Sequence, residues 1–232
     1  MDPLHLHHRV EYTRNKHSRA IYRGDTIVIR LAGNLSKSEE DEHIQNLLRR
    51  MTHIVLQEKK KITIDPFRPL LEGGQFLTVK PANGRLMSFT LTAGERTRAR
   101  AVQGGWLVTV SPQLRRAALH RFLWSLLARS ETAGLTELVA RINASTLRVP
   151  VSAVRVQFAT TQWGSCSSRG VIMLNTALLF LPASALRYVI IHELAHRRIA
   201  RHSPAYWEVV ESVLPDYQTA YDLLKEYRLP QE

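Results

Sequence analysis

The stretch VIIHELAHRRIARHSPAYW, at residues 189–207, constrains this chain more than any other segment. In it, His192, Glu193 and His196 form an H-E-x-x-H pattern. Helical residues four apart share a face, about 6 Å apart along the axis, so the two imidazoles can bind one metal ion. Glu193 lies beside them, where a carboxylate can take a proton from a metal-activated water. The apolar flank and the lack of Gly or Pro over 183–203 predict a helix that ends near Ala200 or Arg201.

His202 is the candidate third ligand. Ser203-Pro204 follows it, an N-cap residue and then Pro at the first helical position, so a new helix is expected from Pro204. The turn between the helices can bring His202 back toward the first two imidazoles. Metzincins share this spacing but have Gly in the turn, where this chain has Ile199. We therefore predict that His192, His196 and His202 bind Zn²⁺ and leave one position for water.

Several motifs accompany the histidines: W-G-S-C-S at 163–167, L-N at 174–175, Pro182, H-E-L-x-H at 192–196 and H-S-x-x-Y-W at 202–207. In these motifs the chain resembles the YgjP-like metal-dependent hydrolases, a bacterial group of zincin-like metallopeptidases related to the SprT and Wss1 proteases. It departs from that pattern at Gln162, where Arg is common, and at Arg201, where Asn is common.

The resemblance implies an α+β fold with a zincin-like metallopeptidase domain. It also implies a zinc-dependent hydrolase, here a metallopeptidase with Glu193 as general base. Members of the group are also described as nucleotide pyrophosphohydrolases, so hydrolysis of a nucleoside triphosphate at the same site is the alternative. A non-catalytic zinc-stapled module that binds nucleic acid is less favoured, because structural zinc usually has four Cys-rich ligands.

The segment 163–168 is expected to be a turn between strands at 151–160 and 171–174. In zincin-like folds such a strand lies along the cleft, so Trp163, Gly164, Ser165 and Cys166 are candidate substrate-binding residues. Tyr206 or Ser165 is a candidate donor to the oxyanion. Trp163 could equally be a core anchor. Cys166 could be a fourth ligand, an inhibitory thiolate or a buried inert residue; a fourth ligand would close the site.

Turn residues and hydrophobic periodicity suggest three regions. These are a flexible tail at 1–19, an α+β region with a small antiparallel sheet at 20–110, and a catalytic region at 111–232. In the middle region a strand with a turn at Gly24-Asp25 precedes a helix that starts after Ser36 or Ser38. Strands follow at 76–79, 87–92, 98–102 and 106–110, and helices at 111–130 and 132–143. Arg96, Arg98 and Arg100 share one strand face, which either binds a substrate or faces solvent.

The net charge is +12, and residues 61–180 contain 15 Lys or Arg against 5 Asp or Glu. Such an excess attracts anionic partners, which include nucleotides, acidic peptides and nucleic acid. No run of 18 apolar residues predicts a membrane span, and the first residues lack the apolar segment of a secretory signal. The single cysteine, Cys166, excludes an internal disulfide and suits a reducing cytoplasm. Oligomeric state does not follow from the sequence.

Overall fold

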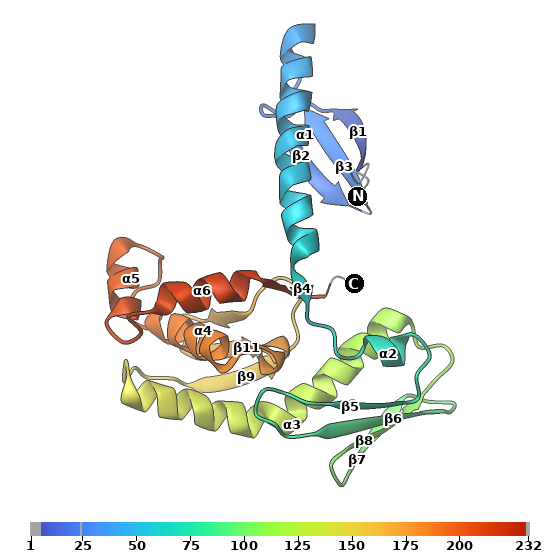
Figure 1. Ribbon diagram of the computed structural model, residues 1–232, viewed down its shortest axis with the longest axis vertical. Helices are drawn as coiled ribbons and strands as arrows, with labels where there is room; N and C mark the ends of the chain where they lie inside the picture. Colours follow the sequence, from blue (N-terminus) through green and yellow to red (C-terminus); the bar gives the residue numbers. More distant parts are fainter. Residues whose placement is uncertain (1–5, 24, 231–232) are drawn as a thin grey trace. The chain divides into compact units, whose positions relative to one another are not determined.

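The computed structural model describes residues 6–23 and 25–230 (Figure 1). The chain divides into two compact units, Met1–Lys61 and Ile62–Glu232. The boundary predicted between residues 110 and 111 does not coincide with this division, because the strands after residue 75 pack on the same core as the C-terminal helices. Residues 1–5 of the predicted tail, and Gly24 of the predicted turn, lie outside the described residues.

The first unit is a three-stranded sheet covered by one helix. Its elements are β1 (His7–Tyr12), β2 (Arg19–Arg23), β3 (Thr26–Leu31) and α1 (Lys37–Lys60). β2 and β3 form an antiparallel hairpin, while β1 pairs parallel to β3, so part of the predicted tail is an edge strand. The reason is burial: Val10 packs on Ile27, Ile29 and Leu31. Ser36 and Glu39 form a capping box at the start of α1, as the acidic first turn indicated.

The second unit begins with β4 (Ile62–Thr63), α2 (Arg68–Leu71) and a four-stranded sheet. The strands are β5 (Phe76–Val79), β6 (Met87–Ala93), β7 (Arg98–Val102) and β8 (Gly105–Val110), in the order β5-β6-β8-β7. The sheet is mixed rather than antiparallel throughout, because β6 and β8 run parallel. Residues 94–97 pass around the end of β8, where Gly94 N–H donates to the carbonyl of Val110 at 3.1 Å. β7 therefore lies beyond β8.

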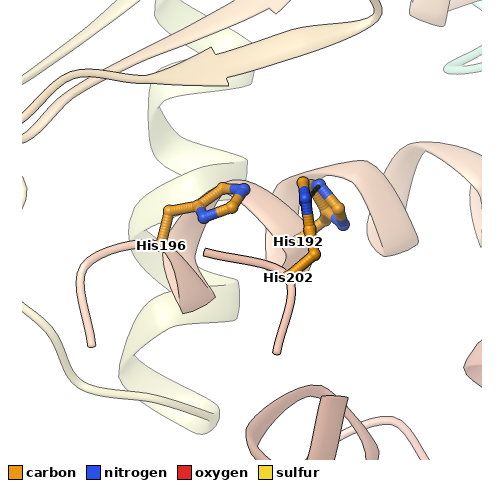
Figure 2. A group of neighbouring side chains, drawn as sticks. All are labelled: His192, His196 and His202. Carbon is orange, nitrogen blue, oxygen red and sulfur yellow. Dashed lines mark hydrogen bonds between the residues drawn. The ribbon is translucent and has the colours of Figure 1, made fainter. Parts of the chain in front are cut away.

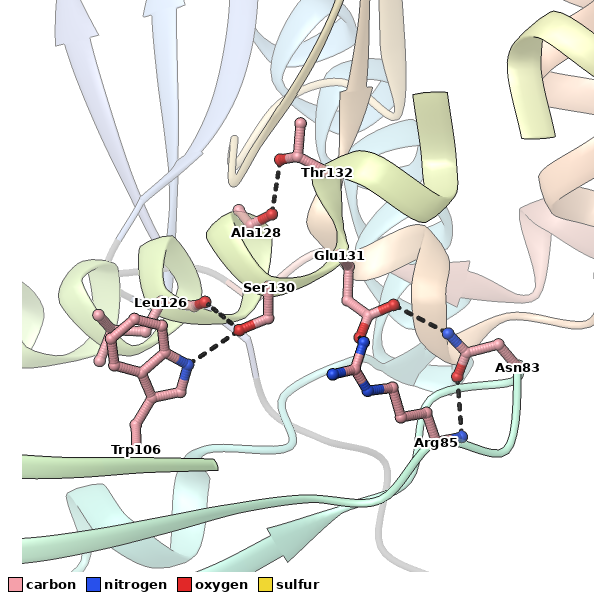
Figure 3. Close-up of polar contacts among 8 residues, drawn as sticks. All are labelled: Asn83, Arg85, Trp106, Leu126, Ala128, Ser130, Glu131 and Thr132. Atoms are coloured by element: carbon pink, nitrogen blue, oxygen red, sulfur yellow. Dashed lines mark hydrogen bonds and ion pairs between the residues drawn. The ribbon is translucent and has the colours of Figure 1, made fainter. Parts of the chain in front are cut away.

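α3 (Arg116–Ser145) is one helix, where two were predicted. The expected break contains Ser130 and Thr132, whose hydroxyls bond to the carbonyls of Leu126 (3.1 Å) and Ala128 (2.7 Å) one turn earlier (Figure 3). These residues therefore continue the helix instead of interrupting it. Ser130 also accepts a hydrogen bond from Trp106 Nε1 at 2.9 Å, which joins the four-stranded sheet to α3.

A second contact holds the loop between β5 and β6 against α3. Asn83 Nδ2 donates to Glu131 Oε2 at 2.8 Å, and Arg85 Nη1 lies 4.0 Å from the other carboxylate oxygen (Figure 3). Glu131 is only 4% exposed. The backbone of Ala82 also donates to the carbonyl of Leu179. The inner face of the sheet is thus fixed to the helical half of the unit, and its outer face is left uncovered by α3.

The remaining elements contain most of the W-G-S-C-S and H-E-L-x-H motifs of the sequence. They are β9 (Ala153–Gln157), β10 (Gly164–Cys166), β11 (Val171–Asn175), the 3₁₀ helix η1 (Thr176–Phe180), α4 (Ala183–Ala195), α5 (Pro204–Glu211), α6 (Tyr217–Lys225) and β12 (Tyr227–Arg228). The sheet order is β10-β11-β9, with β9 and β11 parallel. Half of the segment predicted as a turn, Gly164–Cys166, is therefore an edge strand, β10, antiparallel to β11. Among the described residues, no helix is both long and apolar enough to cross a membrane.

Candidate active site

α4 carries His192 near its end and places His196 at its C-cap. The prediction that this helix continues to Ala200 or Arg201 was wrong, because the chain tightens into turns directly after Ala195. The N–H groups of Arg197 and Arg198 donate to the carbonyls of Leu194 (3.0 Å) and Ala195 (2.9 Å). These i to i−3 bonds satisfy the end of the helix early and turn the chain toward α5.

Two arginine side chains hold this turn in place. Arg197 donates from Nε to the carbonyl of Pro150 and from Nη1 to that of Ser168, each at 3.0 Å. Arg198 donates from Nη2 to the carbonyl of Leu147 at 2.6 Å. These bonds tie the turn to the segments before β9 and before β11. The turn is thus fixed without the glycine that metzincins use at this position.

The turn after α4 places His202 beside the other two histidines. Its Nε2 lies 3.0 Å from Nε2 of His192, and one ring nitrogen from each of the three residues lies within 4.8 Å of the others (Figure 2). Ser203 caps α5 by accepting from the N–H of Tyr206, which fixes the chain directly after His202. The prediction that His202 joins His192 and His196 from the start of the next helix agrees with this geometry.

The surroundings of the imidazoles suit metal binding. Nδ1 of His192 lies 3.4 Å from the hydroxyl of Tyr188, and Nδ1 of His196 lies 3.3 Å from the carbonyl of Ile199. Such partners orient ligating imidazoles and leave the other ring nitrogen for the ion. Burial, and then the neighbouring His196 and His202, lower the pKa of His192 to about 3. Burial also lowers the pKa of His196. Three neutral imidazoles are a donor set that fits a divalent metal ion.

Glu193 lies one residue after the first histidine and is 5% exposed. Burial raises the pKa of its carboxyl group to about 8. A Cβ atom on Gly164 would lie only 2.7 Å from Glu193 Oε1, so the glycine of the W-G-S-C-S motif makes room for this carboxyl group. From its motif alone, Gly164 was predicted only as part of the cleft wall; its closeness to Glu193 follows from the tertiary structure.

Two hollows meet at Glu193, because Gly164, His192 and Glu193 line both of them. The larger, of about 390 Å³, is lined also by Ser165, Cys166 and the other two histidines. The smaller, of about 210 Å³, is lined by apolar and aromatic residues, namely Trp163, Tyr188, Val189, Tyr221 and Leu224. Four of the proposed substrate-binding residues, Trp163 to Cys166, thus lie at the walls of these hollows.

β10 leaves one backbone edge open. Trp163 and Ser167 are bonded to β11, since Asn175 N–H donates to the carbonyl of Trp163 at 2.8 Å and Ser167 N–H to that of Val171 at 2.9 Å. Residues in an antiparallel pair alternate between facing the partner strand and facing away from it. The N–H and C=O groups of Gly164 and Cys166 therefore point to the open edge, beside the larger hollow.

Tyr206 has a different position from the one expected of an oxyanion donor. It is 0% exposed, and its hydroxyl donates to the backbone carbonyl of His192 at 2.9 Å. Neither hollow has Tyr206 among its lining residues. In the described part of the chain, its ring instead contacts all three histidine rings, with centroid separations of 4.8–5.4 Å. Tyr206 therefore packs against the three histidine rings and does not line either hollow.

Cys166 is partly buried and lies outside the group of three histidines. Burial raises the pKa of its thiol. Sequence reasoning missed Tyr188, Tyr221 and Arg197. For Tyr188 a signal was present, because it precedes His192 by four residues and thus shares its helical face. Tyr221 and Arg197 act across long stretches of chain, and no local pattern indicates their contacts.

The family model for the YgjP-like metallopeptidase domain matches residues 16–227. A solved structure, the metallopeptidase zymogen abylysin of Pyrococcus abyssi, is 28% identical over 38% of this chain and 85% of that chain, with a TM-score of 0.33. A search of curated proteins found no significant match. Since the family model covers most of its length, the chain belongs to the YgjP-like metallopeptidase family.

Proposed function

We propose that the chain is a zinc-dependent peptidase with Glu193 as its general base. One observation carries the proposal: three imidazoles converge beside a buried carboxyl group, next to the open edge of a β-strand. This combination supplies a metal-binding group, a proton acceptor and a binding site for an extended chain within one pocket.

Each side chain has a distinct role in this proposal. His192, His196 and His202 hold Zn²⁺, which supplies Lewis-acid chemistry to a carbonyl oxygen and a more acidic water. Glu193 takes the proton of the attacking water on a carboxylate oxygen and gives it to the leaving amine. Tyr188 and the carbonyl of Ile199 orient the imidazoles, and Tyr206 fixes the backbone of His192.

The walls of the pocket favour a peptide substrate. The N–H and C=O groups of Gly164 and Cys166 can pair with an extended backbone in the manner of an added strand. The 210 Å³ hollow, lined by Trp163, Tyr188 and Tyr221 among others, suits an apolar side chain next to the reacting bond. Among the described residues, no lysine or arginine lines either hollow, whereas a triphosphate would need such cations.

The test compares hydrolysis of casein and of nucleoside triphosphates by the full chain, each with and without a chelator. We expect casein cleavage that the chelator abolishes and added Zn²⁺ restores. Glu193→Gln should keep its metal and lose about 10²- to 10⁴-fold in activity, as expected when a general base is removed. Triphosphate hydrolysis with the same dependence on Glu193, and no casein cleavage, would instead support the nucleotide alternative. Unchanged activity of Glu193→Gln would refute the catalytic role of this residue.

A further inference from the structure

The outer face of the four-stranded sheet is the second chemically distinctive surface of this unit. Strand pairing places its residues in three rows across the sheet. The first row is Thr78, Ser88, Gly105 and Val102; the second is Phe76, Thr90, Leu107 and Arg100; the third is Thr92, Thr109 and Arg98. Four strands about 4.8 Å apart make each full row about 14 Å wide. We refer to these eleven residues as the outer sheet face.

The arginines of this face are available for a ligand. Arg98 and Arg100 are exposed, as is Arg96 just before β7. Within residues 6–23 and 25–230, no group accepts a hydrogen bond from these three guanidinium groups or pairs with them. By contrast, the exposed Arg68 pairs with Glu72, and Arg30 with Glu11. Unpaired arginines that share one face of a strand form a concentrated site for phosphate or carboxylate groups.

A pocket lies at the arginine end of this face. It has a volume of about 460 Å³, and the residues that line it include Thr92, Thr109, Arg96 and Arg98. Glu95 is the acidic residue among those that line it. Guanidinium groups beside threonine hydroxyls are the groups that proteins commonly use to contact nucleic-acid phosphates. The chemistry of this pocket is therefore that of a phosphate site.

The opposite edge of the face carries an exposed aromatic ring. Phe76, on the edge strand β5, is 64% exposed, although it lies in the same row as Arg100. Between the two lie Thr90 and Leu107, both partly buried, and the uncharged residues of the other two rows are Thr78, Ser88, Thr92, Thr109, Gly105 and the 43% exposed Val102. Uncharged residues thus separate the ring of Phe76, which can stack on a base, from Arg98 and Arg100, which can bind phosphates.

We propose that the outer sheet face binds single-stranded nucleic acid. The nucleic-acid strand would run along the second row, with a base stacked on Phe76 and backbone phosphates at Arg100 and the neighbouring Arg98. Single-strand binders combine these two elements, a cationic track and an aromatic platform. A chain of acidic residues alone, such as poly-glutamate, could use the arginines, but it carries no planar ring to stack on Phe76. This inference is independent of the proposed peptidase activity, because no residue of the face lines either hollow at Glu193.

The experiment measures binding of fluorescent single-stranded oligonucleotides, both oligo-dT and oligo-U, to the full chain over a range of salt concentrations. Loss of phosphate contacts changes the salt dependence, whereas loss of stacking changes affinity alone. Arg98→Ala/Arg100→Ala should reduce the slope of log K against log salt by about 1.4, or 0.7 for each lost contact. Phe76→Ala should weaken binding about 10-fold or more and leave the slope unchanged.

The matched control is Arg141→Ala/Arg155→Ala, which removes two exposed arginines from α3 and β9. It should bind as the wild-type chain does. Thermal unfolding checks that every variant is folded. Equal loss in this control and in Arg98→Ala/Arg100→Ala would overturn the proposal, because binding would then follow net charge alone. Normal binding by Phe76→Ala, or equal affinity for poly-glutamate, would overturn it too, because the partner would not be recognised by its bases.

Discussion

The pocket around Glu193 and the outer sheet face lie in the same unit, but their polar side chains differ in exposure and in the contacts that they make. In the pocket, Glu193 is 5% exposed and His192 has Tyr188 and His202 as neighbours at 3.4 and 3.0 Å. On the outer sheet face, Arg98 and Arg100 are exposed, and the described residues provide no partner for either. The imidazoles of the pocket are thus held by groups of the protein itself, while the two exposed arginines remain available for a ligand.

From this difference we expect substitutions in the two regions to have different effects on activity and stability. A change in the pocket alters groups that are fixed by several contacts, so its effect on chemistry should be large. A change on the outer sheet face removes only exposed atoms, so the folded state should tolerate it. The following predictions test this contrast, from the largest expected effect to the smallest.

The largest effect is expected for His202→Ala. It removes one of three imidazoles, so the affinity for a divalent metal should fall by more than the roughly 10- to 100-fold that loss of an outer-shell partner costs. Peptidase activity should fall with it. Titration calorimetry with Zn²⁺ measures the affinity, and the neighbouring exposed Arg201→Ala is the control. Retention of wild-type affinity in His202→Ala would mean that this imidazole is not a ligand.

Gly164→Ala should reduce activity by about 100-fold without loss of metal. The new Cβ would lie 2.7 Å from Glu193 Oε1, and a displacement of about 1 Å in a catalytic group can cost that much. Gly134→Ala is the matched control, because a Cβ there meets no atom within 4 Å. Steady-state kinetics and metal content should be measured for both variants. Full activity of Gly164→Ala would show that Glu193 has freedom to move.

Tyr206→Phe separates a supporting role from a chemical one. The lost hydroxyl donates to the carbonyl of His192 in a fully buried position, so the free energy of unfolding should fall by about 1–2 kcal/mol. Activity should fall less than 10-fold. Denaturant unfolding and kinetics test both values, with the partly exposed Tyr221→Phe as comparison. A drop of 100-fold or more at unchanged stability would restore Tyr206 as an oxyanion donor.

Arg98→Ala/Arg100→Ala should leave the peptidase activity and the stability of the chain nearly unchanged. Both side chains are exposed and neither lines either hollow, so activity should stay within about 2-fold and stability within about 0.5 kcal/mol. The same preparations used for oligonucleotide binding serve for the casein assay. A marked loss of casein cleavage would indicate that the outer sheet face also takes part in substrate capture.

The smallest effect concerns Cys166. Burial raises the pKa of its thiol, so at pH 8 the reactive thiolate fraction is lower than that of an exposed cysteine. Iodoacetamide should therefore modify the folded protein more slowly than the urea-unfolded chain, and the rate should keep rising above pH 9. Mass spectrometry follows the modification. A folded protein that reacts as fast as the unfolded one would exclude a buried, inert thiol.

Local patterns predicted the elements of this chain better than their arrangement. The strands at 76–79 and 98–102 and the helix from Pro204 appear as expected, because turn residues and caps act within a few residues. The parallel pairing of β6 with β8, and the strand character of residues 164–166, depend on which chain segment lies alongside. Two helices, at 111–130 and 132–143, were expected where α3 is continuous, and the hydroxyls of Ser130 and Thr132 bond to carbonyls within that helix.

What the sequence alone determined was the chemistry: an H-E-x-x-H pair on one helical face, and a capped helix start that follows His202. These depend on helical periodicity and on backbone groups a few residues away. Only the tertiary structure decided that the helix ends at Ala195, that Arg197 and Arg198 hold the turn, and that Gly164 leaves space for the Glu193 carboxyl group. Those contacts join residues 29–51 positions apart, and burial and packing, which no local pattern encodes, select them.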